Sequence, residues 1–223
     1  MSKITWHAAG TKKFEAGVSK GVFYPQTAGK YESGAEPWNG LTNVTESPSG
    51  AEVTDLWADD VKYGSLRSGE NYGGTIEAYM YPDGFEKCDG YAEVAPGVVI
   101  GQQARQPFGM SYVSQIGSDA IPVGTTAYKI HLVWGATVSP SERSHSTINE
   151  SPEADTMSWE YTCDPVTVTG HKPSASMTID STKVDATKLK ALEDILYGSE
   201  STEPKLPLPD EVIAIVGDKA LAD

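Results

Sequence analysis

The chain of 223 residues is 39% hydrophobic and 22% charged, and it carries a net charge of −14 at pH 7. Its length and apolar content are sufficient for one large β-rich domain with its own core. The acidity argues against binding to nucleic acid or to anionic membranes, and it leaves two interpretations open: a charge that serves solubility alone, or a surface along which polyanions slide without sticking.

Segments typical of β-strands follow one another along most of the chain, separated by turns. The turns combine Pro with Gly, as in SPSG (47–50), YPDG (81–84) and APG (95–97), and each combination favours a chain reversal. The expected strands span residues 14–24, 41–45, 53–57, 75–81, 108–116, 128–138, 156–163, 166–169 and 175–179. Strands in this number and at this spacing predict a mainly β fold, either a sandwich or a barrel.

Two of these segments show a clear alternation of apolar and polar residues. In 75–81, Ile76, Ala78 and Met80 share one face, and in 156–163 the apolar face carries Trp159 and Tyr161. Such alternation places one face on a core and the other toward solvent or a partner. The polar positions expected on the outer faces include Thr75, Glu77, Ser158 and Glu160.

One amphipathic helix is predicted over residues 186–197, after an N-cap at Asp185 or Ser181. Gly198 is suited to end this helix. We expect the helix to pack on one face of a sheet or to cover a sandwich edge. Its apolar residues recur at spacings of three and four, and they are Leu189, Leu192, Ile195 and Leu196.

Two stretches are predicted to be extended and loosely packed. Residues 25–39 are rich in Gly, Pro, Glu and Ser, with Tyr31 and Trp38 as aromatic side chains. Residues 199–209 contain three prolines, which favour a polyproline-like conformation. The apolar segment 210–216 that follows is expected either to close the sheet as a last strand or to reach onto a neighbouring subunit.

The sequence offers no pattern typical of an active site. The histidines show no pair at metal-ligand spacing, and His131 lies within an expected strand, where a structural role is favoured. Asp55, Asp59 and Asp60 surround Trp57, but they lie at turns and strand margins, where Asp is favoured for backbone reasons. A glycosidase requires two carboxylates on opposite sides of a cleft. No nucleophile elbow, Walker loop or dinucleotide fingerprint occurs. The sequence therefore predicts a protein that is not an enzyme and that holds no cofactor and no metal.

The cysteines and the hydropathy bear on the compartment. Cys88 and Cys163 lie on separate segments and are expected to be reduced thiols in a core, with metal binding or a disulfide as alternatives. No run of about 18 apolar residues occurs, which predicts no membrane span. The first residues lack an apolar stretch of signal-peptide length, so we expect a protein that is made and kept in a cytoplasm.

A series of phrases, collinear over residues 14–212, resembles the major tail protein of long-tailed, non-contractile phages of Gram-positive hosts. The phrases are WNGLTNVTESPSGAE (38–52), LWADDVKY (56–63), TIEAYMYPDGFEKCDG (75–90), IGQQ (100–103), YKIHLVWG (128–135), SPSE (139–142), SPEA (151–154), SWE (158–160), DATKLKALEDILY (185–197) and LPLPDE (206–211). No single phrase carries chemistry, so the resemblance lies in the collinear set.

The resemblance implies a single tail-tube domain over 1–223, with two packed antiparallel β-sheets and one flanking helix. Such subunits form hexameric rings that stack into a tube, with tape-measure protein in the lumen and with tail terminator and distal tail proteins at the ends. DNA passes through the lumen without specific binding. The protein would be assembled in the cytoplasm of the bacterial host and would reside in the virion tail, and the family has no catalytic residues to carry over.

Within this hypothesis, the polar strand positions Thr75, Glu77, Ser158 and Glu160 are candidates to line the lumen, where acidic side chains would repel DNA phosphates. An open alternative is that this face meets solvent or a neighbouring ring. Residues 25–39 and 199–223 are expected to be an inter-ring loop and a C-terminal arm. The candidate inter-subunit contacts on them are Tyr31, Trp38, Leu206, Leu208 and Val212.

Two other functions remain open at this point. A different structural protein of the tail, such as a terminator or a decoration protein, would share the β-rich and acidic character. A carbohydrate-binding module would use Trp38, Trp57 or Trp134 as a platform for sugar rings.

Overall fold

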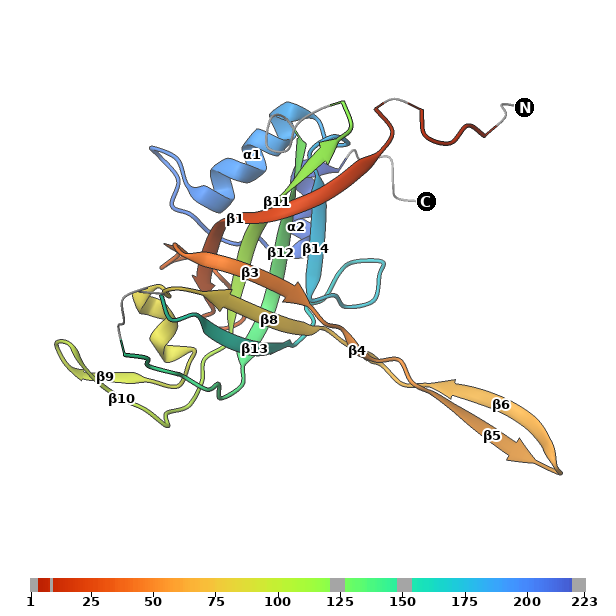
Figure 1. The fold of residues 1–223 in the computed structure, drawn as a ribbon, viewed down its shortest axis with the longest axis horizontal. Helices are drawn as coiled ribbons and strands as arrows, with labels where there is room; N and C mark the ends of the chain where they lie inside the picture. Colours follow the sequence, from red (N-terminus) through yellow and green to blue (C-terminus); the bar gives the residue numbers. More distant parts are fainter. Residues whose placement is uncertain (1–3, 9, 121–126, 148–153, 218–223) are drawn as a thin grey trace.

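The protein is described from a computed structural model, which covers residues 4–8, 10–120, 127–147 and 154–217. Its main sheet has eight antiparallel strands in the order β2-β1-β11-β12-β13-β8-β3, with β14 beside β12. The expected mainly β, antiparallel fold is therefore confirmed, and its two layers belong to one continuous sheet that folds over itself (Figure 1).

The bounds of the elements are as follows. The main sheet consists of β1 (Lys13–Pro25), β2 (Glu36–Pro37), β3 (Leu41–Glu46), β8 (Gly73–Ala78), β11 (Phe108–Ser118), β12 (Ala127–Val138), β13 (Met157–Cys163) and β14 (Ser176–Asp180). The separate two-stranded pairs are β4 (Ser49–Gly50) with β7 (Glu70–Asn71), β5 (Val53–Ala58) with β6 (Val61–Arg67), and β9 (Ala92–Ala95) with β10 (Val98–Ile100). The helical elements are the 3-10 helix η1 (Asp83–Lys87) and the α-helices α1 (Ala186–Tyr197) and α2 (Pro209–Val216).

The sheet bends at Gly135 in β12. The first part of β12 pairs with β14, and its last three residues pair with β13. Between these parts Gly135 has a φ of +64°, and a Cβ there would lie 2.3 Å from the carbonyl oxygen of Asp164. Only glycine accommodates both the positive φ and this close backbone approach. Because of the bend, β13, β8 and β3 cross over one face of β11 and β12 (Figure 1).

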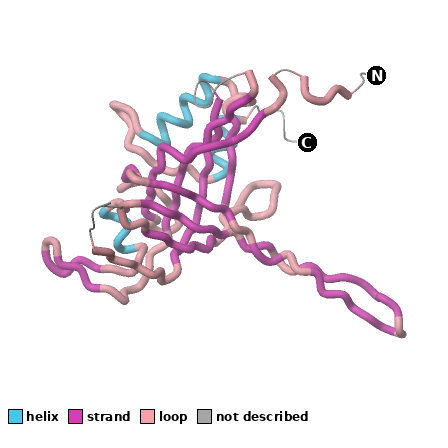
Figure 2. Tube along the Cα trace, in the orientation of Figure 1, coloured by secondary structure: helices cyan, strands magenta, loops and turns pink. Residues whose placement is uncertain are grey.

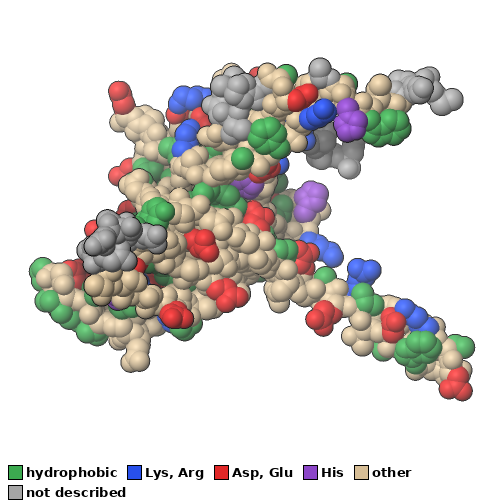
Figure 3. Space-filling model, in the orientation of Figure 1, with side chains coloured by type: hydrophobic (Ala, Val, Ile, Leu, Met, Phe, Trp, Pro, Cys, Tyr) green, Lys and Arg blue, Asp and Glu red, His purple; other side chains and the backbone are tan. Residues whose placement is uncertain are grey.

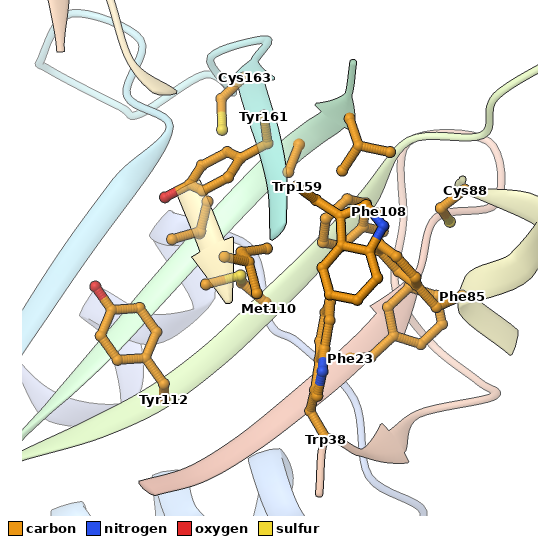
Figure 4. Packing of buried hydrophobic residues seen from close by; sticks show 14 of the residues in the cluster. Phe23, Trp38, Phe85, Cys88, Phe108, Met110, Tyr112, Trp159, Tyr161 and Cys163 are labelled. Atoms are coloured by element: carbon orange, nitrogen blue, oxygen red, sulfur yellow. The ribbon is translucent and has the colours of Figure 1, made fainter. Parts of the chain in front are cut away.

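The first core fills the space between the two layers of the folded sheet. The rings of Phe23, Trp38, Phe85, Phe108 and Trp159 are all buried and meet edge-to-face or tilted, with centroids 4.7–6.5 Å apart (Figure 4). Such pairs add to the stabilisation that burial of the rings already provides. This aromatic cluster holds β13 and η1 against β1 and β11.

The second core lies on the opposite face of the sheet, beneath the helices. The N-cap of α1 is Asp185, whose Oδ1 accepts a hydrogen bond of 2.9 Å from the backbone N–H of Thr187. The helix spans the residues predicted for it, which confirms the prediction. It buries Leu189, Leu192 and Leu196 against Ile130, Leu132, Trp134 and Tyr24 of the sheet.

Two local predictions are wrong. The strand β8 ends at Ala78, so Met80 lies beyond it and is 56% exposed instead of facing the core. Residues 166–169 do not form a strand, because Val166 makes only an isolated bridge to Ser174. In both places fewer residues pair with a neighbouring strand than the alternation of side chains indicates.

The predicted arms are part of the domain itself. Tyr31, Trp38, Leu206 and Val212 are at most 4% exposed, and Leu208 is half-buried and packed against the second core. Their expected role as exposed inter-subunit contacts is therefore not supported. Segment 210–216 forms α2, with Pro at its first position, instead of a closing strand or an arm. Removal of 199–223 would consequently strip apolar cover from the second core.

Burial of α2 can be tested with two neighbouring residues of the helix. We expect Val212→Ala to lower the free energy of unfolding by about 2 kcal/mol, because it leaves a cavity at a fully buried position. The matched variant Ile213→Ala, at a position that is 43% exposed, should cost well under about 1 kcal/mol. Urea denaturation measures both, and equal effects would mean that α2 does not pack as described.

Candidate functional site

The four predicted outward-facing positions lie together on one sheet face. In the register of β13 and β8, Ser158 is opposite Glu77 and Glu160 is opposite Thr75. The next strand, β3, extends the same polar face with Asn43, whose Nδ2 donates to Glu77 Oε2 at 3.3 Å. We call this surface of β3, β8 and β13 the polar sheet face. Its residues turn away from the aromatic core, and its place along a lumen stays a prediction.

A long β-hairpin projects from the domain between β3 and β8. We call residues 49–71 the hairpin arm; it comprises the pairs β4–β7 and β5–β6 (Figure 2). All six residues of β5 are exposed, so neither face of that strand is covered by the rest of the described chain. The large apolar side chains of the arm, with exposed fractions of 40–78%, are Val53, Leu56, Trp57, Val61, Tyr63 and Leu66.

Local chemistry explains why the hairpin arm is formed without a core. Its tip is a two-residue turn in which Asp59 and Asp60 have φ values of 50° and 61°, as in a type I′ turn that suits twisted strands. Midway along the arm, Asp55 Oδ1 accepts from Ser65 Oγ at 2.7 Å and lies 2.8 Å from Lys62 Nζ. The hydrogen bonds from Lys62 and then Ser65 lower the pKa of Asp55. This triad holds the register of the two strands.

Apolar side chains in this number on a bare hairpin point to a contact surface. A two-stranded hairpin alone is marginally stable in water, and contiguous exposed apolar patches mark sites of interaction. The sequence predicted the strand at 53–57 but not its exposure. The available signal was that β5 and β6 carry apolar residues on both faces, at Leu56 and Trp57 for example, and that carboxylates flank them.

A polar hollow of 540 Å³ lies where β1, β3, β11, β12 and β14 meet. Ser114 Oγ donates its proton to Glu15, so His131 Nε2, 2.8 Å from Ser114 Oγ, must be the donor of that second hydrogen bond. The imidazole stacks on Tyr112 with 4.6 Å between ring centroids. Lys129 also pairs with Glu15.

This geometry does not activate a nucleophile. A histidine that donates to the serine oxygen cannot accept the serine proton, and the carboxylate of Glu46 stands 3.6 Å from His131 Nδ1, too far for a hydrogen bond. The group instead ties β1 to β11 and β12 with side-chain hydrogen bonds. His131 is thus structural, as its position in a strand indicated.

The thiols are also unsuited to reactivity. Cys88 and Cys163 are free and buried, and burial raises the pKa of each to about 12. Among the described residues no three His, Cys, Asp or Glu side chains gather as metal ligands. None of the described helices is long and apolar enough to cross a membrane.

Comparisons with known proteins return no family for this chain. No family model matches it. No curated protein matches it significantly either. The features available for a functional assignment are therefore those of its own surfaces: the hairpin arm, the polar sheet face and the polar hollow.

The polar hollow predicts a pH dependence of stability. Burial lowers the pKa of His131 below its usual value of about 6.5, against the opposing attraction of Glu46 and Glu15. At pH values below the usual pKa of histidine and above the lowered pKa of His131 in the folded chain, the unfolded chain binds a proton that the folded chain does not. The free energy of unfolding should therefore fall as the pH drops from 7 toward 5.

Urea denaturation at several pH values checks this expectation. In His131→Gln the fall between pH 7 and 5 should be smaller than in the natural chain, because the titrating group is gone. The histidines at 7, 145 and 171 remain in both proteins and serve as the common background. An identical pH profile for the two proteins would contradict the assignment.

Proposed function

We propose that this chain is a structural subunit that assembles with copies of itself into stacked rings, as the tail-tube subunit of a long-tailed, non-contractile phage. The observation that carries the proposal is the hairpin arm, whose apolar side chains have no partner within the described chain. The collinear resemblance of residues 14–212 to the major tail proteins supports the same function independently.

The shape of the hairpin arm favours assembly over binding of a small ligand. A projecting strand pair buries area on both faces when it lies against another molecule, and burial of its apolar side chains would stabilise the complex. A projection on one subunit needs a differently shaped acceptor on the next, so the contact is heterologous. Repeated heterologous contacts produce rings if they close and filaments if they do not.

The polar sheet face suits the lumen of such a tube. Thr75 and Ser158 are small and polar, and Glu77 and Glu160 add negative charge beside them. A water-filled channel with this surface repels phosphate, so DNA would move through it without binding. In this proposal tape-measure protein occupies the lumen before ejection, terminator and distal tail proteins close the ends, and the rings are hexameric.

Of the alternatives, the carbohydrate-binding module is less well supported. Trp134 is fully buried and Trp38 is 4% exposed, so neither can stack on a sugar ring. Trp57 is exposed, but it lies on a narrow projecting hairpin instead of a concave or flat platform. A different structural protein of the tail, such as a decoration protein, would also use the hairpin arm, but it would not form long tubes from a single component.

Assembly can be tested with substitutions on the hairpin arm. We expect the natural chain at high concentration, with or without isolated tail tips as seeds, to form rings or tubes in negative-stain electron microscopy. The double variant Trp57→Ser, Tyr63→Ser should stay monomeric in sedimentation velocity while keeping its unfolding free energy, because both side chains are exposed in the monomer.

The matched control is Phe14→Ser, which removes an aromatic side chain that is 50% exposed on β1. It should assemble like the natural chain. Small monodisperse particles from the natural chain, even when seeded, would contradict the proposed function. Tubes of normal length from the Trp57, Tyr63 variant would show that assembly does not use the hairpin arm.

A further inference from the structure

A second hollow, of 460 Å³, lies on the other side of the domain from the hairpin arm. It is formed by the turn at Asp89–Tyr91, the segment at Gly101–Gln103, Arg105, and residues 140, 141 and 143. The chain has three arginines among 223 residues, and two of them, Arg105 and Arg143, line this one hollow. We call it the arginine hollow. Asp89 lines the same hollow and offsets one of these two positive charges.

Arg143 is fixed and neutralised by its neighbours. Its Nη2 lies 2.5 Å from Asp89 Oδ2, and that buried carboxylate also accepts from Trp159 Nε1 at 3.0 Å. The rings of Tyr81 and Tyr91 lie 5.1 Å and 4.9 Å from its Cζ. These contacts hold Arg143 in one place, so it forms a rigid wall of the hollow.

Arg105, in contrast, has a guanidinium with no partner among the described residues. Within the described part of the chain its side chain forms no ion pair and no hydrogen bond, and its Nε is buried without an acceptor. Buried polar groups in folded proteins are normally hydrogen-bonded. A planar guanidinium that lines a hollow matches the geometry of a carboxylate, which can accept two parallel hydrogen bonds.

A matching acidic group lies at the tip of the hairpin arm. Asp59 and Asp60 are consecutive and exposed, and neither forms an ion pair with a described residue. Exposed apolar side chains flank them, with Trp57 at 67% and Val61 at 60%. Figure 3 shows the acidic residues at the far end of the arm, next to apolar ones.

The rim of the arginine hollow has the complementary composition. The pair β9–β10 leads directly into the segment at 101–103 that lines the hollow. Its exposed apolar side chains, with exposed fractions of 42–58%, are Val94, Val98, Val99 and Ile100. Each surface thus combines apolar side chains with a charged group, namely Asp59 and Asp60 on the arm and Arg105 in the hollow, while Glu93 of β9 adds one negative charge to the rim.

We propose that the arginine hollow of one copy binds the Asp59–Asp60 turn of a second copy, with Arg105 paired to a carboxylate and β9–β10 packed on the apolar sides of the arm. This inference rests on the proposed self-assembly and names its acceptor. The β9–β10 pair and the tip of β5–β6 lie at opposite ends of the long axis of the molecule (Figure 1). The hairpin arm of one chain therefore cannot reach the arginine hollow of the same chain, and each contact between two copies is head-to-tail.

Charge reversal tests the contact. Arg105→Glu alone and the double change Asp59→Lys, Asp60→Lys alone should each weaken self-association by at least about tenfold, since each opposes like charges at a desolvated pair. The chain that carries all three changes should recover most of the association. Lys172→Glu, which alters an exposed cation outside both surfaces by the same charge, is the control and should associate normally.

A mixture of the two defective chains gives a sharper result. The Arg105→Glu chain keeps a natural arm for the natural hollow of the Asp59→Lys, Asp60→Lys chain, and its reversed hollow is complementary to the reversed arm of that chain. Sedimentation velocity should show mixed assemblies that form only when both chains are present. A mixture that stays monomeric, or single variants that associate like the natural chain, would overturn the inference and leave the proposed function standing.

Two more outcomes would count against the inference. If the natural chain never self-associates, the proposed function and the inference both fail. If inorganic phosphate shifts the amide resonances around Arg105 in NMR titration while the charge-reversed chains assemble normally, the hollow binds a free anion. That result would also overturn the assignment to a second copy.

Discussion

The backbone N–H of Gly135 donates a hydrogen bond of 2.8 Å to Tyr31 Oη. This bond joins the bend of the main sheet to the loop at 25–39, and the rest of the fold depends on that link. Gly135 is where β12 exchanges β14 for β13, so the sheet folds over itself there. Tyr31 brings residues 25–39 to this bend, and its own carbonyl accepts from the backbone N–H of Leu206 at 3.2 Å, which fixes the segment before α2. This buried contact therefore links the bend of the sheet to the segment before α2 at the edge of the second core.

The bend also determines where the surfaces used for assembly emerge. Once β13, β8 and β3 cross the sheet, their apolar side chains face the first core and their polar ones form the polar sheet face. The hairpin arm extends the β3–β8 pair beyond the domain. At its base a Cβ on Gly74 would lie 2.0 Å from the carbonyl oxygen of Thr45, so the two strands approach closely there. The arm is therefore a continuation of the sheet.

Sequence patterns predicted the elements whose signals are local. The alternation in 157–163 and the cap and apolar stripe of 186–197 depend on neighbours a few residues away, and both elements have their expected positions. Residues 25–39 and 199–216 pack more closely than predicted, because a Pro-rich and Gly-rich composition is shared by free arms and by loops that pack. What buries Tyr31 and Val212 is a partner distant in sequence. The exposure of the hairpin arm was missed for the same reason, since alternation predicts a strand but not whether anything covers it.

The placement of the hairpin arm at one end and the arginine hollow at the other has a consequence for any chain of copies. Such an assembly is polar: one terminus presents unoccupied arms, and the other presents unoccupied hollows. The two termini would differ in charge and in shape, so a protein that recognises one would not recognise the other. Growth could then start at one terminus and be stopped at the opposite one by a second, chemically unrelated protein, without any change in the subunit itself.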